Sequence, residues 1–122
     1  MEFKNSKPIF LQIAELIGDE ILRGKYPEGG RLPSVREYAA EVEVNANTVV
    51  RSFDWLSQQD IIFNRRGMGY YVSEGATERI RHSLREAFFH ETLPEVSEQM
   101  LKLDISVEEV KKVLEDLQES KK

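Results

Sequence analysis

Apolar positions that recur every three or four residues predict three helices in the first half of the chain. They are expected over residues 8–23, 34–41 and 45–59. Ser34 stands at the start of the second helix with the spacing of a capping box, and Asn45 is a favoured N-cap residue for the third. Because only a short turn separates the second helix from the third, the pair fits a helix-turn-helix.

Two β-prone runs follow within residues 61–72, on either side of a loop that contains Gly67 and Gly69. This pattern predicts a β-hairpin. Three helices followed by a hairpin make a winged helix-turn-helix, so the expected fold class is mainly α with a small β-hairpin. We expect residues 1–75 to form this domain.

Residues 76–122 are expected to form a short helical dimerisation region. Its first helix is predicted to end near residues 92–94, a second follows, and a third begins at a capping box on Ser106. The third carries an apolar stripe that needs a partner surface, which either a second copy or the same chain could supply. The expected dimerisation residues are Leu84, Phe88, Val107, Val110, Leu114 and Leu117.

Composition places the chain among soluble globular proteins. It has 122 residues, of which 40% are hydrophobic and 32% charged. No apolar run approaches the roughly 18–20 residues of a membrane span, and no apolar segment near the N-terminus marks export. A cytoplasmic location and no membrane partner are therefore expected. The absence of cysteine excludes disulfides and thiolate sites.

Net charge gives no sign of a polyanionic partner. The chain carries −5 overall, with 9 Lys/Arg against 11 Asp/Glu in residues 1–75 and 8 against 11 in residues 76–122. Any binding of nucleic acid must therefore use a local cationic patch.

The exposed face of the third helix carries side chains that suit the DNA major groove. Asn47 and Arg51 lie four residues apart, Thr48 lies beside them, and Asn45 opens the helix. Arginine can pair with guanine and asparagine with adenine, while a helix N-terminus attracts phosphate. The alternative is an ordinary solvated helix face.

Two other cationic features point in the same direction. Residues 65–69, RRGMG, place two arginines at the predicted hairpin tip, where they can follow a phosphate backbone or enter the minor groove. Arg36 lies in the first turn of a helix, where the helix dipole disfavours a cation, so a nearby phosphate would explain it. The alternatives are a solvated turn and an ion pair with a neighbouring acid.

Residues 8–72 resemble the DNA-binding domain of the GntR family of bacterial transcription regulators. The matching blocks are PI-x-LQIAE, GxRLPSVRE, NxNTVVR and RRGxGxxV, in this order and without a gap. The remaining 50 or so residues are too few for the larger effector-binding domains of most GntR subfamilies. They resemble the YtrA-type subfamily, whose short helical tails form dimers.

The resemblance implies which residues contact DNA. They are Ser34, Arg36, Asn45, Asn47, Thr48, Arg51, Arg65, Arg66, Gly67 and Gly69. Glu43 departs from the family, because glycine is common in the turn before the recognition helix. Either another residue therefore takes the left-handed conformation or the turn differs. Ala46 and Val50 also depart from the family, which leaves the operator sequence open.

The expected function is sequence-specific regulation of transcription, with repression favoured, by a homodimer on a palindromic operator in double-stranded DNA. The alternative is a winged-helix protein–protein interaction module without specific DNA binding. His82 and Glu86 share a helix face, but two ligands do not make a metal site, and no nucleophile and base pair up. We therefore expect neither an enzyme nor a cofactor, and leave open a small-molecule effector.

Overall fold

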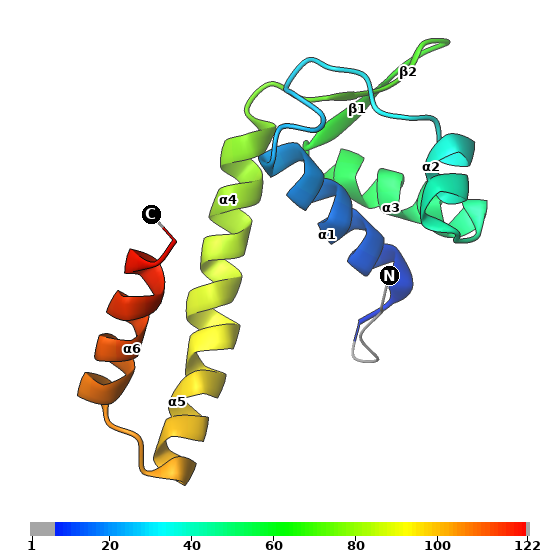
Figure 1. The fold of residues 1–122 in the computed structure, drawn as a ribbon. Coiled ribbons are helices and arrows are strands. Elements are labelled where there is room, and N and C mark those ends of the chain that lie inside the picture. Colours follow the sequence, from blue (N-terminus) through cyan, green and yellow to red (C-terminus); the bar gives the residue numbers. More distant parts are fainter. Residues whose placement is uncertain (1–6, 122) are drawn as a thin grey trace. The chain divides into compact units, whose positions relative to one another are not determined.

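The computed structural model describes residues 7–121, in two compact units that divide between Ser83 and Leu84 (Figure 1). The N-terminal segment on which the export expectation rests lies mostly outside the described residues. The elements in chain order are α1 (Ile9–Leu22), α2 (Val35–Val42), α3 (Ala46–Gln58), β1 (Ile62–Arg65), β2 (Gly69–Val72), α4 (Ala76–Ala87), the π-helical turn η1 (Phe88–Thr92), α5 (Leu93–Leu103) and α6 (Val107–Glu119). The first unit ends within α4.

One apolar core joins α1, α2, α3 and the hairpin in the first unit. Side chains from each of these elements are fully buried: Ile13, Ile17, Tyr38, Val49, Phe53, Leu56, Ile62 and Val72. The Phe53 ring packs edge-on against Tyr70 of β2, with ring centroids 4.9 Å apart. The predicted winged helix-turn-helix, mainly α with a small β-hairpin, is confirmed.

The hairpin has a third segment that the sequence did not predict. β1 and β2 are antiparallel, with Arg65 opposite Gly69. On the other edge of β2, the Gly29 N–H donates to the Val72 carbonyl at 2.8 Å, and the Leu32 N–H donates to the Tyr70 carbonyl at 2.9 Å. The connector between α1 and α2 is therefore fixed to the hairpin.

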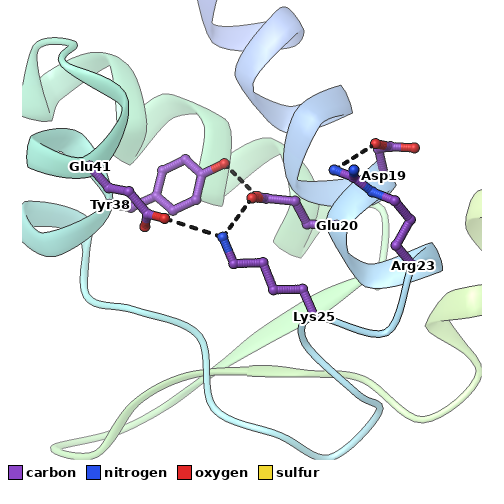
Figure 2. Close-up of polar contacts among 6 residues, drawn as sticks. All are labelled: Asp19, Glu20, Arg23, Lys25, Tyr38 and Glu41. Carbon is purple, nitrogen blue, oxygen red and sulfur yellow. Dashed lines mark hydrogen bonds and ion pairs between the residues drawn. The ribbon is translucent and has the colours of Figure 1, made fainter.

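A buried carboxylate joins α1 to α2 (Figure 2). Glu20 is only 7% exposed, and its Oε1 accepts a 2.7 Å hydrogen bond from the Tyr38 hydroxyl. Lys25 Nζ lies 3.1 Å from Glu20 Oε2 and 3.2 Å from Glu41 Oε1. Burial and the bond to Glu20 raise the pKa of Tyr38, and hydrogen bonds to the two carboxylates raise the pKa of Lys25. Tyr38 thus keeps its proton and Lys25 its charge.

The turn between α2 and α3 differs from both alternatives that the family pattern left open. Glu43 itself takes the left-handed conformation, with φ 57° and ψ 50°. The Val44 N–H then donates to the Ala39 carbonyl at 3.0 Å, which closes α2. A non-glycine residue in this conformation costs about 1–2 kcal/mol. The Glu43 side chain is exposed, so no packing clash adds to that cost.

The prediction that a helix ends near residues 92–94 is wrong. The helix continues from α4 through η1 into α5, because the Leu93 N–H donates to the Phe88 carbonyl five residues back. Pro94 has no N–H, and its ring would crowd the carbonyl four residues earlier in a regular α-helix. A π-turn widens the backbone at this point and accommodates the proline.

The second unit has no core of its own. Every described residue from Leu84 onward is exposed or half-buried. α6 begins at the predicted capping box, in which Ser106 Oγ accepts from the Glu109 N–H at 3.1 Å and Glu109 Oε1 accepts from the Ser106 N–H at 3.0 Å. Within residues 7–121, no helix is both long and apolar enough to cross a membrane.

Replacing Tyr38 with phenylalanine is expected to lower the free energy of unfolding by about 1–3 kcal/mol, because the buried Glu20 carboxylate loses a hydrogen-bond donor. Urea denaturation followed by circular dichroism measures the change. Tyr71→Phe is the matched control, because the Tyr71 hydroxyl has no hydrogen-bond partner among residues 7–121. Equal losses in the two variants would contradict the role given to Glu20.

Candidate nucleic-acid interface

The apolar face of α3 holds its polar face outward. Val49 and Phe53 are fully buried, whereas Asn47 and Arg51 are exposed and Thr48 is half-buried. Buried Ser52 donates to the Phe10 carbonyl at 2.7 Å and thereby fixes α3 against the start of α1. The reading face predicted for this helix is therefore presented by a rigid scaffold.

Asn45 and Ser34 both act as helix caps. Asn45 Oδ1 accepts from the Asn47 N–H at 2.8 Å, which leaves the Asn45 NH₂ group as the part available to a ligand. Ser34 Oγ accepts from the Glu37 N–H at 3.1 Å, so its hydroxyl proton is still available for donation. The returning bond from the Ser34 N–H to Glu37 Oε1 lowers the pKa of Glu37. The free N–H and O–H donors at both helix starts are suited to phosphate.

Arg51 is stacked on another side chain. Its guanidinium carbon lies 4.3 Å from the centroid of the Phe10 ring. Stacking occupies the face of the guanidinium and leaves the N–H donors around its edge free to pair in a fork. Sequence reasoning assigned Arg51 to base contact but gave no sign of Phe10, because α1 and α3 meet only in the folded chain.

The hairpin carries a ladder of aromatic rings and cations. The Phe63 and Tyr71 rings stack with centroids 5.9 Å apart, and the Arg65 guanidinium lies 4.8 Å from the Tyr71 centroid. Residues 61–73 contain two arginines and no acidic residue. Figure 1 shows the hairpin projecting from the helices of the first unit. A basic projection of this kind is the local patch that an acidic protein requires to approach DNA.

Sequence reasoning missed Arg31 as a candidate. Arg31 pairs with Tyr71 in an isolated β-bridge, and its guanidinium lies over Gly69, in the space that a side chain there would need. A Cβ at Gly69 would lie 3.3 Å from Arg31 Nε, and the φ of 106° also favours glycine there. Arg31 lies within the GxRLPSVRE block, but only the third segment of the sheet brings it to the hairpin.

The remaining predicted residues are exposed. Arg36 and Arg66 form no ion pair within the described residues, so both cations are available to an external anion. Gly67, at the hairpin tip, has φ 75°, which favours glycine. The structure thus gathers Arg31, Arg65 and Gly69 at the hairpin. It places Asn47 and Arg51 on α3, and Ser34 and Arg36 at the start of α2.

The histidine of η1 contacts a carboxylate without forming a ligand cluster. His90 Nε2 lies 3.1 Å from Glu86 Oε2. Across the part of the chain that the structure describes, no three His, Asp or Glu side chains converge as metal ligands would.

A family model matches about the first half of the chain. The family model described as "Bacterial regulatory proteins, gntR family" matches residues 10–72, which include nearly all of α1, the helix-turn-helix and the hairpin. The chain belongs to the GntR family. The predicted resemblance is thereby confirmed, and the protein is a DNA-binding transcription regulator of a non-enzymatic family.

Relatives of this GntR-family regulator share most of its length. The HTH-type transcriptional regulator YhcF of Bacillus subtilis is 37% identical over 109 residues, which are 89% of this chain and 88% of YhcF. The crystal structure of a GntR-family transcriptional regulator from Bacteroides thetaiotaomicron is 42% identical and superposes with a TM-score of 0.79. That comparison covers 94% of this chain and 100% of the other.

YtrA identifies the subfamily. The HTH-type transcriptional repressor YtrA of Bacillus subtilis is 40% identical over 73 residues, which are 60% of this chain and 56% of YtrA. The GntR-family protein described here is of the YtrA type.

Arg51→Ala is expected to weaken binding to the specific DNA sequence about tenfold or more, with little effect on a scrambled duplex, because the base contact predicted for Arg51 would be lost. Fluorescence-anisotropy titrations of both duplexes measure the effect. Arg66→Ala is the matched control. It is expected to weaken both duplexes alike and to reduce the salt slope by about 1, as a phosphate contact would. A loss of affinity in Arg51→Ala that is equal on both duplexes would contradict its role as a base reader.

Proposed function

We propose that this YtrA-type regulator binds a palindromic operator as a homodimer and represses transcription. The observation that carries the proposal is the exposed apolar surface of the second unit. Val107 is 68% exposed, Leu114 49% and Leu117 56%. Apolar side chains gathered on one helix face are typical of an interface, because water-exposed apolar area favours association.

Apolar side chains are also exposed in α4 and η1. Leu84 is 52% exposed and Phe88 47%, whereas Val110 is half-buried. Since the second unit buries none of its described residues, we assign these apolar side chains to a self-complementary interface with a second copy. This assignment makes the second unit the dimerisation region and the first unit the DNA-binding domain.

DNA recognition is assigned to three parts of the first unit. We propose that Asn47, Thr48 and Arg51 read base edges from α3 and that Ser34, Arg36 and the Asn45 NH₂ group contact the backbone. Arg65 and Arg66, with Gly67 and Gly69, would hold the hairpin along the phosphates or in the minor groove. A twofold dimer presents two such sets, so the operator would be a palindrome. Repression is proposed because the relative YtrA is named a repressor.

The first test is a fluorescence-anisotropy titration of the wild-type protein against the DNA upstream of its own gene, beside a scrambled duplex. We expect tight, salt-dependent binding that prefers the native sequence. Four arginines in each chain, Arg31, Arg36, Arg65 and Arg66, can make up to eight phosphate contacts in a dimer. The slope of log affinity against log salt would then approach about −7. Weak binding to both duplexes without a salt slope would instead favour a protein-binding winged helix.

The second test breaks the proposed interface. Leu114→Glu is expected to give a monomer by sedimentation and to weaken operator binding about 100-fold or more, because the two DNA-binding domains lose their link. Lys112→Glu is the matched control, since it places the same side chain on the opposite side of α6. A dimeric Leu114→Glu protein with full operator affinity would overturn the assigned interface.

A further inference from the structure

The start of α4 is capped by a residue from a distant part of the chain. Glu28 Oε1 accepts from the Gly75 N–H at 2.8 Å, and Glu28 Oε2 accepts from the Thr77 N–H at 3.1 Å. A carboxylate at this position satisfies helix N–H groups and complements the positive end of the helix dipole. These bonds lower the pKa of Glu28, so the carboxylate is ionised at neutral pH.

Glu28 also stands next to the segment that completes the hairpin. Gly29, its neighbour, donates to the Val72 carbonyl, and Arg31 pairs with Tyr71 two residues later. A single stretch of chain thus holds the base of the hairpin and the first turn of α4 together.

Arg79 makes a second clamp on the same helix. Its Nη1 donates to the Asp60 carbonyl at 2.9 Å and to the Glu74 carbonyl at 3.0 Å. Asp60 lies two residues beyond Gln58, the last residue of α3, and takes the left-handed conformation, with φ 59°. Arg79 therefore fastens α4 to the segment that directly follows the recognition helix.

Two neighbouring residues of α4 carry the same charges without these clamps. Arg81 Nη1 lies 3.1 Å from Glu78 Oε1, and both side chains are more than half exposed. This pair supplies matched controls for the two clamps, because Glu78 has the same side chain as Glu28, Arg81 has the same side chain as Arg79, and neither makes the clamp contacts.

We propose that Glu28 and Arg79 are positioning residues that determine which half-site spacing the dimer accepts. The inference rests on the proposed homodimer. α4 crosses from the DNA-binding unit into the dimerisation unit as one continuous helix. Each reading helix is therefore connected to the dimer through the first turn of α4. The contacts of Glu28 and Arg79 determine how rigidly that turn is held against the DNA-binding unit. A looser attachment lets the reading helices reach half-sites at other spacings.

The test measures affinity as a function of spacing. An operator selected by the wild-type protein from random duplexes is remade with one base pair removed, or one or two added, at its centre. Each added pair moves one half-site by about 3.4 Å and rotates it by about 35° around the DNA axis. For each protein, the readout is the ratio of Kd at the shifted spacing to Kd at the native spacing, with a single half-site duplex measured alongside.

For the wild-type protein, the ratio of Kd at the shifted spacing to Kd at the native spacing is expected to be about 10 or more. Glu28→Gln and Arg79→Met are expected to reduce it about fivefold, with single half-site affinity within about twofold of the wild type. Glu78→Gln and Arg81→Met, which change the same charges, are expected to keep the wild-type ratio. Circular dichroism and sedimentation check that all four variants are folded dimers.

Each other outcome has one meaning. A wild-type ratio kept by both clamp variants overturns the inference and leaves the proposed dimer intact. An equal loss of affinity on single half-sites and full operators also overturns it, because the clamps would then serve only the fold of the DNA-binding unit. A wild-type protein that binds every spacing and the single half-site equally well overturns the proposed dimeric function and the inference with it.

Discussion

The architecture of the DNA-binding unit depends on a single buried carboxylate. Glu20 is removed from water within α1, and a buried carboxyl group in that position is tolerated because Tyr38 and Lys25 donate hydrogen bonds to its two oxygens. Tyr38 belongs to α2, so the same contact fixes where the first helix of the helix-turn-helix lies on α1. Glu43 then sets the direction in which α3 leaves α2, and Ser52 fixes α3 against the start of α1. The orientation of α3 therefore depends on the Glu20 contact together with these two features.

Acidic and basic side chains have different roles in the DNA-binding unit. Three glutamates make structural contacts: Glu20 joins two helices, Glu37 closes a capping box and Glu28 caps α4. The hairpin keeps only cations, with Arg31 added from the neighbouring segment. A protein of net charge −5 can therefore carry a local basic surface of the kind that suits DNA. Net charge alone would have argued against the function that the family establishes.

The sequence predicted those parts of the fold that depend on local interactions. The capping boxes at Ser34 and Ser106 and the helical periodicity depend on residues three or four apart, and the structure confirms them. Contacts between residues far apart in the sequence, such as the bridge between Arg31 and Tyr71, could not be predicted from local patterns. The left-handed conformation of Glu43 was not predicted, because glycine is the residue that adopts this conformation most readily. The Glu43 side chain is exposed to solvent, so a charged residue is tolerated there. The candidate DNA contacts came from side-chain chemistry and family resemblance, which cannot reveal a stack such as that of Arg51.

That stack has a thermodynamic consequence. A free arginine side chain has several rotatable bonds, and fixing it on a ligand costs about 2 kcal/mol of conformational entropy. Phe10 restricts the Arg51 guanidinium before any DNA arrives, so part of that ordering takes place when the protein folds. A contact between a ring and a guanidinium face also weakens little with ionic strength, unlike contacts to phosphate. Preference for one base sequence should therefore persist at salt concentrations where total affinity has fallen.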